Sequence, residues 1–420
     1  MRSLLRSPGM NTKNTFQAEK ELSNALQKLL AYCRQNDWAG YDPYDALNSR
    51  VLKAFPILDS RIPRIAMTQA LKLSPVNVRG LLGIPKTQNS KALAVFLSSF
   101  LNMSAEQVAD RDCLIGNMIG LIAAKKSPGA SYWCWGYSFP WQTRFEVVPA
   151  EAPNLVCTTF VALALLDAYD QNGDPKCLEM AISAAEYILN ELYWTEGSEI
   201  AGFSYPQPGV RSKTHNANLL AAALLCRVYK HTGDGKFLGP ALTVARYSVS
   251  KQRDDGSWDY GEAPSQRWID NFHTGYNLRA LQAMSRYAGI SEFESSIRRG
   301  FEFYRTHFFR EDGVARYFHD RTYPIDIHSV AEGIITLLAF RDLDPKNVAL
   351  AQSVFQWAMN HMWDDRGFFY YRVLRLATIR TSYMRWSQAW MLLAMSVLLG
   401  ELKAEAGHTQ LQNVLPMVQA

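Results

Sequence analysis

The sequence lacks the features that stabilise small secreted domains and those that span membranes. Its 420 residues include six cysteines, which lie far apart and form no CxxC pair. This spacing argues against a disulfide framework and against a cysteine-rich zinc site. No window approaches 18 uninterrupted apolar residues, so we expect no stable membrane insertion.

The chain also has only a small excess of charge of one sign. The formal net charge is +5, and 20% of the residues are charged. Lys and Arg do not run together as they do in segments that bind nucleic acids or membrane surfaces. The first residues contain basic side chains without the apolar stretch of a secretory signal. These absences predict a cytoplasmic protein with no nucleic-acid partner.

What the chain has is a large apolar fraction, 48%, arranged in a repeat. Five segments begin with polar residues and continue as an apolar helix. Equivalent positions in these segments are 57, 58, 55 and 58 residues apart, at Thr158, His215, His273, His328 and Trp386. A glycine followed by aromatic residues precedes four of these helices, at 201–205, 255–260, 312–318 and 366–371. Amphipathic segments precede these turns, at 175–192, 236–251, 292–308 and 345–362.

The repeating unit is therefore an outer helix, a glycine turn and a buried inner helix. Stacking such units predicts an all-α fold, an (α/α)6-type toroid with inner and outer helix rings. Helical segments at 15–35, 90–101 and 105–125 supply the sixth hairpin. We expect a flexible N-terminus over 1–14, a single toroid domain over 15–402 and a C-terminal tail over 403–420.

A toroid brings the polar starts of its inner helices to one end, where they form the floor of a cleft. The free N–H groups at those helix ends favour an anionic ligand. Imidazole and carboxylate groups there can transfer protons, and the candidates are Asp270, His273, Asp326 and His328. The candidates for substrate binding are Tyr137, Trp141, Arg144, His215, Asn216, Asn271, Arg385, Trp386 and Gln388.

Each of these residues also has a structural interpretation. Asp270 and Asp326 form a candidate general acid–base pair, but an acid at a helix start can simply cap the helix. The aromatic stretch around Tyr137 and Trp141 suits stacking on a sugar ring, with Arg144 binding a carboxylate, or it forms a large structural turn. Three histidines on neighbouring helices would have to lean toward one point to bind zinc. We therefore expect no metal and no cofactor.

Several motifs resemble those of known toroids. "QRDDGSWDYG" (252–261) resembles the repeated turn of squalene–hopene-type terpene cyclases, although their DxDD motif is absent. "MRWSQAWMLLA" (384–394) resembles a segment of unsaturated glucuronyl hydrolases, with Trp386-Ser387 where Arg-Gly is expected. The histidines at helix starts are similar to those of N-acylglucosamine 2-epimerases. The combination of "WGYSFPWQTR", "DNFHTGYNL" and "MRWSQAW" most resembles a bacterial polysaccharide-biosynthesis family of VpsJ type.

The VpsJ-type resemblance implies a carbohydrate-active protein of exopolysaccharide biosynthesis, and carries over Asp270, His273 and Arg385 as site positions. Its substrate would be a polysaccharide or oligosaccharide, uronate-bearing or not, processed by hydrolysis, elimination or epimerisation. Association with polysaccharide assembly machinery is a further expectation. The alternatives are a non-catalytic toroid that binds a glycan or a partner, and an isoprenoid-processing toroid, which the missing DxDD motif disfavours.

Overall fold

The computed structural model describes residues 12–55, 60–143 and 146–414. Arg144 and residues 1–11 of the expected flexible N-terminus lie outside the described residues. The helix that begins the described chain starts at Thr12, inside the segment expected to be flexible. The last helix ends at Val414, inside the segment expected to be a tail.

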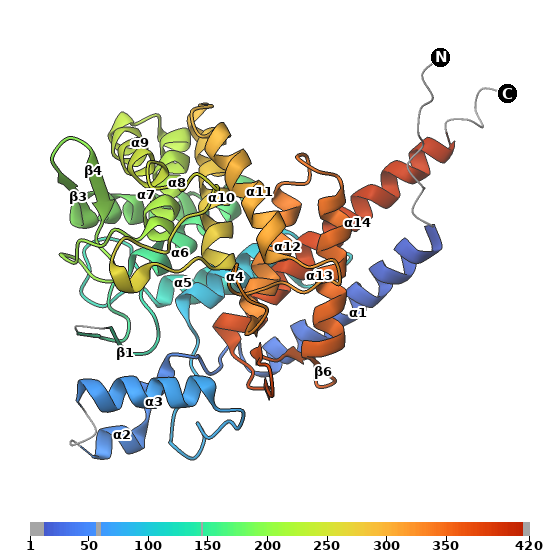
Figure 1. The fold of residues 1–420 in the computed structure, drawn as a ribbon, viewed down its shortest axis with the longest axis horizontal. Coiled ribbons are helices and arrows are strands. Elements are labelled where there is room, and N and C mark those ends of the chain that lie inside the picture. The colour runs from blue at the N-terminus through green and yellow to red at the C-terminus, as the bar shows by residue number, and fades with distance from the viewer. Residues whose placement is uncertain (1–11, 56–59, 144–145, 415–420) are drawn as a thin grey trace.

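Six helices with polar starts and apolar bodies form an inner ring (Figure 1). They are α4 (Ser90–Leu101), α6 (Leu155–Asn172), α8 (His215–Thr232), α10 (Asn271–Ala288), α12 (Ile327–Ala339) and α14 (Ala389–Val414). Each packs against the next one in the chain, and α14 packs against α4, which closes the ring. Three of them end at a glycine in the left-handed region, which stops a helix at little cost, at Gly173, Gly233 and Gly289.

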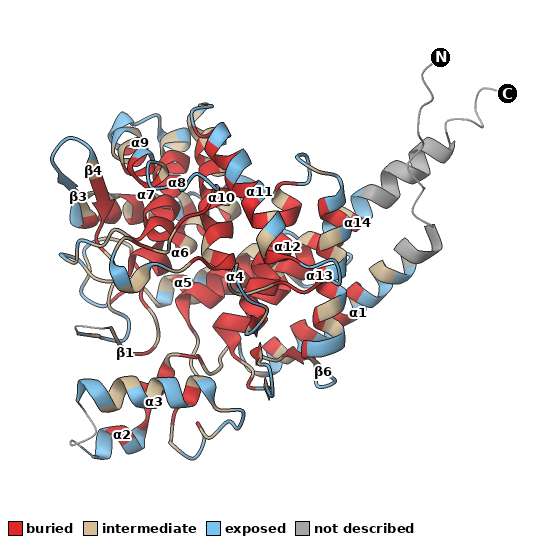
Figure 2. Cartoon of the chain, viewed as in Figure 1, coloured by how far each residue is buried: buried red, intermediate tan, exposed pale blue. Residues whose placement is uncertain are grey.

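Six further helices pack outside this ring, each against an inner helix. They are α1 (Thr12–Gln35), α5 (Arg111–Ala124), α7 (Pro175–Tyr187), α9 (Gly235–Val249), α11 (Glu294–Phe308) and α13 (Lys346–Met362). Where burial is coloured in Figure 2, the inner helices are buried over most of their length, while the outer helices expose one side. The predicted all-α toroid is confirmed. Among the described residues, no helix is long and apolar enough to cross a membrane.

Three of the four predicted glycine turns pack closely against the backbone of the next outer helix around the ring. Gly256, Gly313 and Gly367 have φ between 85° and 90°. A Cβ on Gly256 would lie 2.4 Å from the carbonyl oxygen of Arg299 in α11, and Gly313 and Gly367 approach α13 and α1 in the same way. Glycine is needed at these positions both for the positive φ and for the close approach of two backbones.

The first predicted turn differs from the other three. Residues 200–203 form a strand, and the turn lies at Gly197, where φ is 65°. Gly202 lies in the strand beneath Trp194, whose ring would clash with a Cβ there. A glycine does occur at the predicted position of this unit. It lies in a strand of a hairpin, under an indole ring, instead of in the turn.

The strands of the described residues are short and form four antiparallel sheets, β1–β2, β3–β4, β6–β7 and β5–β8–β9. Their bounds are β1 (Trp141–Gln142), β2 (Val147–Val148), β3 (Tyr193–Glu196), β4 (Ile200–Phe203), β5 (Ile325–Asp326), β6 (Trp363–Asp364), β7 (Phe368–Phe369), β8 (Arg372–Val373) and β9 (Thr378–Ile379). They connect outer to inner helices at the end of the ring where the inner helices start.

One segment lies outside the repeat. Between α1 and α4 the chain forms a short 3-10 helix (Asp45–Asn48), α2 (Arg50–Ala54) and α3 (Arg61–Leu73). These elements have a small core of their own, made by Ala46, Leu47, Leu52, Leu71 and Ile84. Figure 1 shows α2 and α3 together below the helix rings. The repeat did not predict this segment, which contacts the mouth of the toroid.

Candidate functional site

Capping explains part of the polar mouth. The side chains of Asn89, Asn154, Asp270 and Asp326 each accept a hydrogen bond from a first-turn N–H of α4, α6, α10 and α12. Both aspartates are therefore helix caps. In each aspartate one carboxylate oxygen accepts the capping bond. The other contacts of the carboxylate therefore show which further role the residue can have.

Asp270 forms a dyad with His273. Its Oδ2 lies 2.7 Å from His273 Nδ1 and accepts a 2.9 Å bond from the indole N–H of Trp268, while Oδ1 caps the helix. The Asp270 side chain is fully buried, but 20% of the His273 side chain is exposed. The buried carboxylate orients the ring with Nδ1–H toward Asp270, which leaves Nε2 as the free, basic nitrogen.

His328 is held at both ring nitrogens. Nδ1 lies 3.1 Å from the carbonyl oxygen of Trp386, so Nδ1 carries the proton, and Nε2 accepts a 2.7 Å bond from the Tyr276 hydroxyl. Burial lowers the pKa of His328 well below its usual value, and the charge of Lys91 adds to this. His328 is therefore a neutral imidazole that fixes the position of the Tyr276 hydroxyl.

Asp326 is fully paired. Its Oδ2 accepts two bonds from the Arg372 guanidinium, at 2.9 and 2.6 Å, and its Oδ1 accepts a 2.8 Å bond from the indole N–H of Trp386. The side chain has no exposed area. Asp326 holds Trp386 and the β8 strand in place at the mouth.

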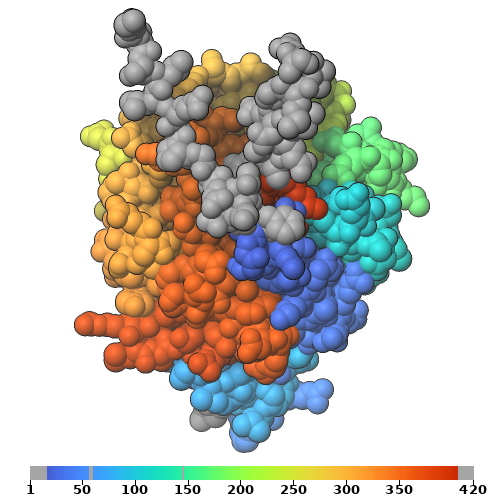
Figure 3. Space-filling model, turned by 90° about the vertical axis from the view of Figure 1, so that its right-hand side faces the viewer, coloured from blue at the N-terminus to red at the C-terminus, as the bar shows by residue number. Residues whose placement is uncertain are grey.

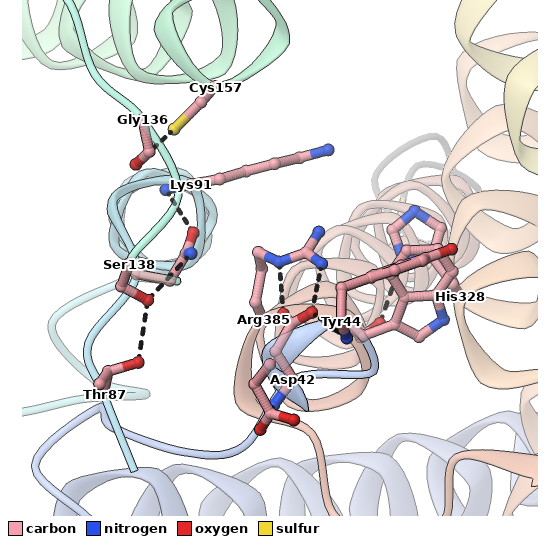
Figure 4. A network of polar contacts seen from close by, with 12 residues as sticks. Asp42, Tyr44, Thr87, Lys91, Gly136, Ser138, Cys157, His328 and Arg385 are labelled. Atoms are coloured by element: carbon pink, nitrogen blue, oxygen red, sulfur yellow. Dashed lines mark hydrogen bonds and ion pairs between the residues drawn. The ribbon is translucent and has the colours of Figure 1, made fainter. Parts of the chain in front are cut away.

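Arg385 forms a buried ion pair with a residue that the sequence did not indicate. Its Nε and Nη2 donate to the two carboxylate oxygens of Asp42, at 2.6 and 2.8 Å, and each side chain is 6% exposed. The guanidinium also lies over the ring of Tyr137, 5.0 Å from its centre. Tyr44, from the same segment as Asp42, contacts the Trp386 ring. This segment thus covers part of the mouth (Figure 4).

Lys91, at the start of α4, is the second missed residue. Its ammonium lies 4.0 Å from the ring centre of Phe160, 5.4 Å from that of Trp390 and 5.6 Å from that of Tyr276. No described carboxylate forms an ion pair with it, and only 5% of the residue is exposed. Burial lowers the pKa of Lys91 to about 7, and the charge of Arg385 contributes. Figure 4 shows this side chain extending from its helix toward the side of Arg385 and His328.

Ring contacts join many of the predicted residues into one cluster. Trp386 contacts Tyr44, Phe272 and His328, and Phe272 contacts His273. The predicted residues in this cluster are Asp270, His273, Asp326, His328, Tyr137, Arg385 and Trp386. The structure therefore brings together the two predicted histidine–acid positions and the last helix start.

The other predicted residues have different surroundings. Gln388 exchanges hydrogen bonds with the backbone of Phe369, which fastens strand β7 to the π-helix (Met384–Gln388) that precedes α14. Asn271 accepts a bond from the Tyr304 hydroxyl. Trp141 lies on β1 at the edge of the aromatic group around Tyr137.

His215 and Asn216 begin α8 and are buried. Burial lowers the pKa of His215 to about 4, and neither its Nδ1 nor Asn216 Oδ1 has a hydrogen-bond partner among the described residues. Burial also raises the pKa of the Cys157 thiol to about 12, which leaves it unreactive. Within the described chain no group of three His, Cys, Asp or Glu residues is arranged to hold a metal.

No protein family and no curated protein matches the sequence. Solved structures do match. An unsaturated glucuronyl hydrolase from Streptococcus agalactiae aligns over 93% of both chains with 13% identity and a TM-score of 0.57. The chain has the α/α-toroid fold.

Two further structures share this fold. A cellobiose 2-epimerase from Spirochaeta thermophila aligns over 74% of this chain and 85% of its own, with 15% identity and a TM-score of 0.56. A GH76 α-mannanase from Bacteroides thetaiotaomicron aligns over 77% and 88%, with 15% identity and a TM-score of 0.57. At these identities the similarity concerns the fold, and activity must be argued from the site.

Proposed function

We propose that this protein is a carbohydrate-active enzyme that moves a proton at a sugar carbon next to a carbonyl or carboxyl group. The reaction is epimerisation or elimination. The observation that carries the proposal is the dyad of His273 and buried Asp270 at the mouth of the toroid, with a ring nitrogen left free. The fold adds support, because sugar-acting enzymes with three different activities share it.

The dyad has the parts of a general base. His273 Nε2 takes the proton from the carbon, and the resulting imidazolium is stabilised by the Asp270 carboxylate 2.7 Å from Nδ1. The electron pair left on the carbon moves onto the neighbouring carbonyl oxygen, where a cation or an N–H group stabilises it. Lys91 is a nearby cation that has no carboxylate partner among the residues described. When the intermediate turns its other face toward His273, return of the proton from Nε2 gives an epimer, while loss of a neighbouring oxygen substituent gives an unsaturated sugar.

Hydrolysis fits this site less well. It needs two carboxyl groups, one free to protonate the leaving oxygen and one free to act as base or nucleophile. Asp42, Asp326 and Glu332 are instead each bound by an arginine, and Asp270 is bound by His273. The described carboxylates of the mouth and the ring interior are thus engaged, whereas an imidazole nitrogen is free.

The biological setting that we propose is exopolysaccharide production, with a polysaccharide or oligosaccharide as substrate. This part rests on the motifs around Tyr137, Asp270 and Arg385. Tyr137 and Arg385 are in contact, and ring contacts connect Arg385 with His273 through Trp386 and Phe272.

The test follows carbon-bound hydrogen in deuterated water. The purified protein is incubated with reducing oligosaccharides and with uronate-bearing exopolysaccharide fragments, and NMR and mass spectrometry follow the sugars. We expect deuterium uptake at one carbon, with an epimer or an unsaturated end as product. Asp270→Asn should lower the rate by a factor of roughly 10²–10⁴, because the base loses its charged partner.

A matched histidine serves as the control. His361 lies on the outer helix α13 and stacks on Trp357, so His361→Gln should leave the rate unchanged, whereas His273→Gln should abolish exchange. Fragments that gain water without deuterium at carbon would refute the proposal in favour of hydrolysis. Calorimetric binding without any turnover would make the protein a non-catalytic glycan-binding toroid.

A further inference from the structure

Exposed apolar side chains are concentrated in the segment outside the repeat. Of nine large apolar side chains that are exposed in the described chain, six lie between Val51 and Leu81. They are Val51, Phe55, Ile62, Leu73, Val76 and Leu81, with exposed fractions from 37% to 86%. Figure 3 shows this segment projecting from the lower edge of the molecule. We call these six residues the apolar patch.

Helix α3 shows that this exposure has a direction. The side facing the protein carries Arg64, which bonds Gln142 of β1, and the buried Leu71. The opposite side carries Ile62, Ala66, Ala70 and Leu73, all exposed and spaced by four, four and three residues. This spacing places them in one row along the helix. The outer side of α3 is therefore mainly apolar, with Gln69 as an exposed polar residue on it, where a helix on a monomer's surface would carry mostly polar residues.

The charge of this segment is mainly positive, and its buried Asp45 is paired with Arg79. Between Ala46 and Ala105 the sequence contains a single acid, Asp59, and eight basic residues. Arg50, Lys53 and Arg61 are exposed and flank the apolar patch. Consecutive basic residues are three to eight positions apart, which is why no run of Lys and Arg marks them in the sequence.

We propose that α2, α3 and the turn after them bind the surface of an anionic lipid bilayer. Apolar side chains next to exposed Lys and Arg are the composition of helices that lie in a membrane interface, where the apolar groups enter the acyl boundary and the cations meet the phosphates. An acidic lipid surface matches the charge of the segment.

Vesicle sedimentation with the full-length protein tests this. Vesicles of phosphatidylcholine mixed with phosphatidylglycerol should bind the protein, and vesicles of phosphatidylcholine alone should bind it much less. The double variant I62D/L73D should weaken binding by roughly tenfold to a hundredfold, because two apolar side chains no longer enter the interface. The triple variant R50Q/K53Q/R61Q should weaken binding and remove its dependence on salt.

Leu376 provides a matched control, since it is 95% exposed in the turn between β8 and β9, away from the patch. Leu376→Asp should bind vesicles like the unmodified protein. Circular dichroism should show all variants folded, because every substituted side chain is exposed. Equal binding of I62D/L73D and the unmodified protein would overturn the proposal, as would no binding to anionic vesicles. Light scattering that shows a dimer, dissociated by I62D/L73D, would instead assign the patch to contact between two copies.

Discussion

The most specific prediction about stability concerns Lys91. Its ammonium is buried among three aromatic rings, with no carboxylate partner in the described part of the chain, and its pKa falls from 10.5 in the unfolded chain to about 7. The unfolded chain therefore keeps a proton that the folded protein has lost between these two pH values. Unfolding takes up a proton in this range, so the contribution of Lys91 to stability rises with pH from about 7 to 10.5.

The size of this effect follows from the two pKa values. Each tenfold change in proton affinity corresponds to about 1.4 kcal/mol, so the charged form of Lys91 costs the folded state about 5 kcal/mol. Lys91→Met keeps an unbranched side chain of similar length and removes the charge. We expect the variant to be more stable than the unmodified protein at pH 6, by up to about 5 kcal/mol, and this advantage to disappear as the pH approaches 10.5.

Urea unfolding of both proteins at several pH values measures this difference. Other titrating groups are shared by the two proteins and cancel in the comparison. Lys176→Met is the control, since Lys176 is exposed on α7, and its difference from the unmodified protein should not change with pH. A stability difference for Lys91→Met that is the same at every pH would refute the reasoning, because it would mean that the buried amine keeps an ordinary pKa.

Two further substitutions test the contacts that hold the mouth and the turns. Asp42→Asn leaves the buried Arg385 guanidinium without its counterion, and urea unfolding should show a loss of about 3–5 kcal/mol, most of which the double variant D42L/R385M recovers. Gly256→Ala places a Cβ 2.4 Å from the Arg299 carbonyl oxygen at a φ of 89°, so its thermal midpoint should fall by several degrees. Gly116→Ala, in α5 with nothing within 4 Å of the new Cβ, should raise the midpoint instead.

The repeat predicted the rings because its signals are local. Helical spacing of apolar residues and a glycine before four of the inner helices are properties of neighbouring positions, and the outer helices at 236–251 and 345–362 begin within one residue of prediction. The convergence of Asp270 and His273 at the mouth also follows from the helix starts. The pattern does not show which oxygen or nitrogen of each side chain already has a hydrogen-bond partner.

The partners of these side chains come from distant parts of the chain. Asp42 and Arg385 are 343 positions apart, and the segment that carries Asp42 has no equivalent in the other units. No local spacing predicts such a pair. Lys91 left a weaker signal, since it is the one charged residue in the apolar helix "SKALAVFLSSFL". A single charged residue in an otherwise apolar helix indicates a position with an unusual environment.

The closure of the ring has a consequence for how the chain is made. In an open array of repeats each new unit can add to those already folded, and the array is stable before it is finished. Here α4 needs α14 beside it, and the turn at Gly367 rests on α1, so units from opposite ends of the chain depend on each other. Until α14 has left the ribosome, the ring of the nascent chain is incomplete and has an apolar gap. Chains that stop before Ala389 should therefore be captured by chaperones or aggregate, whatever the quality of the units already formed.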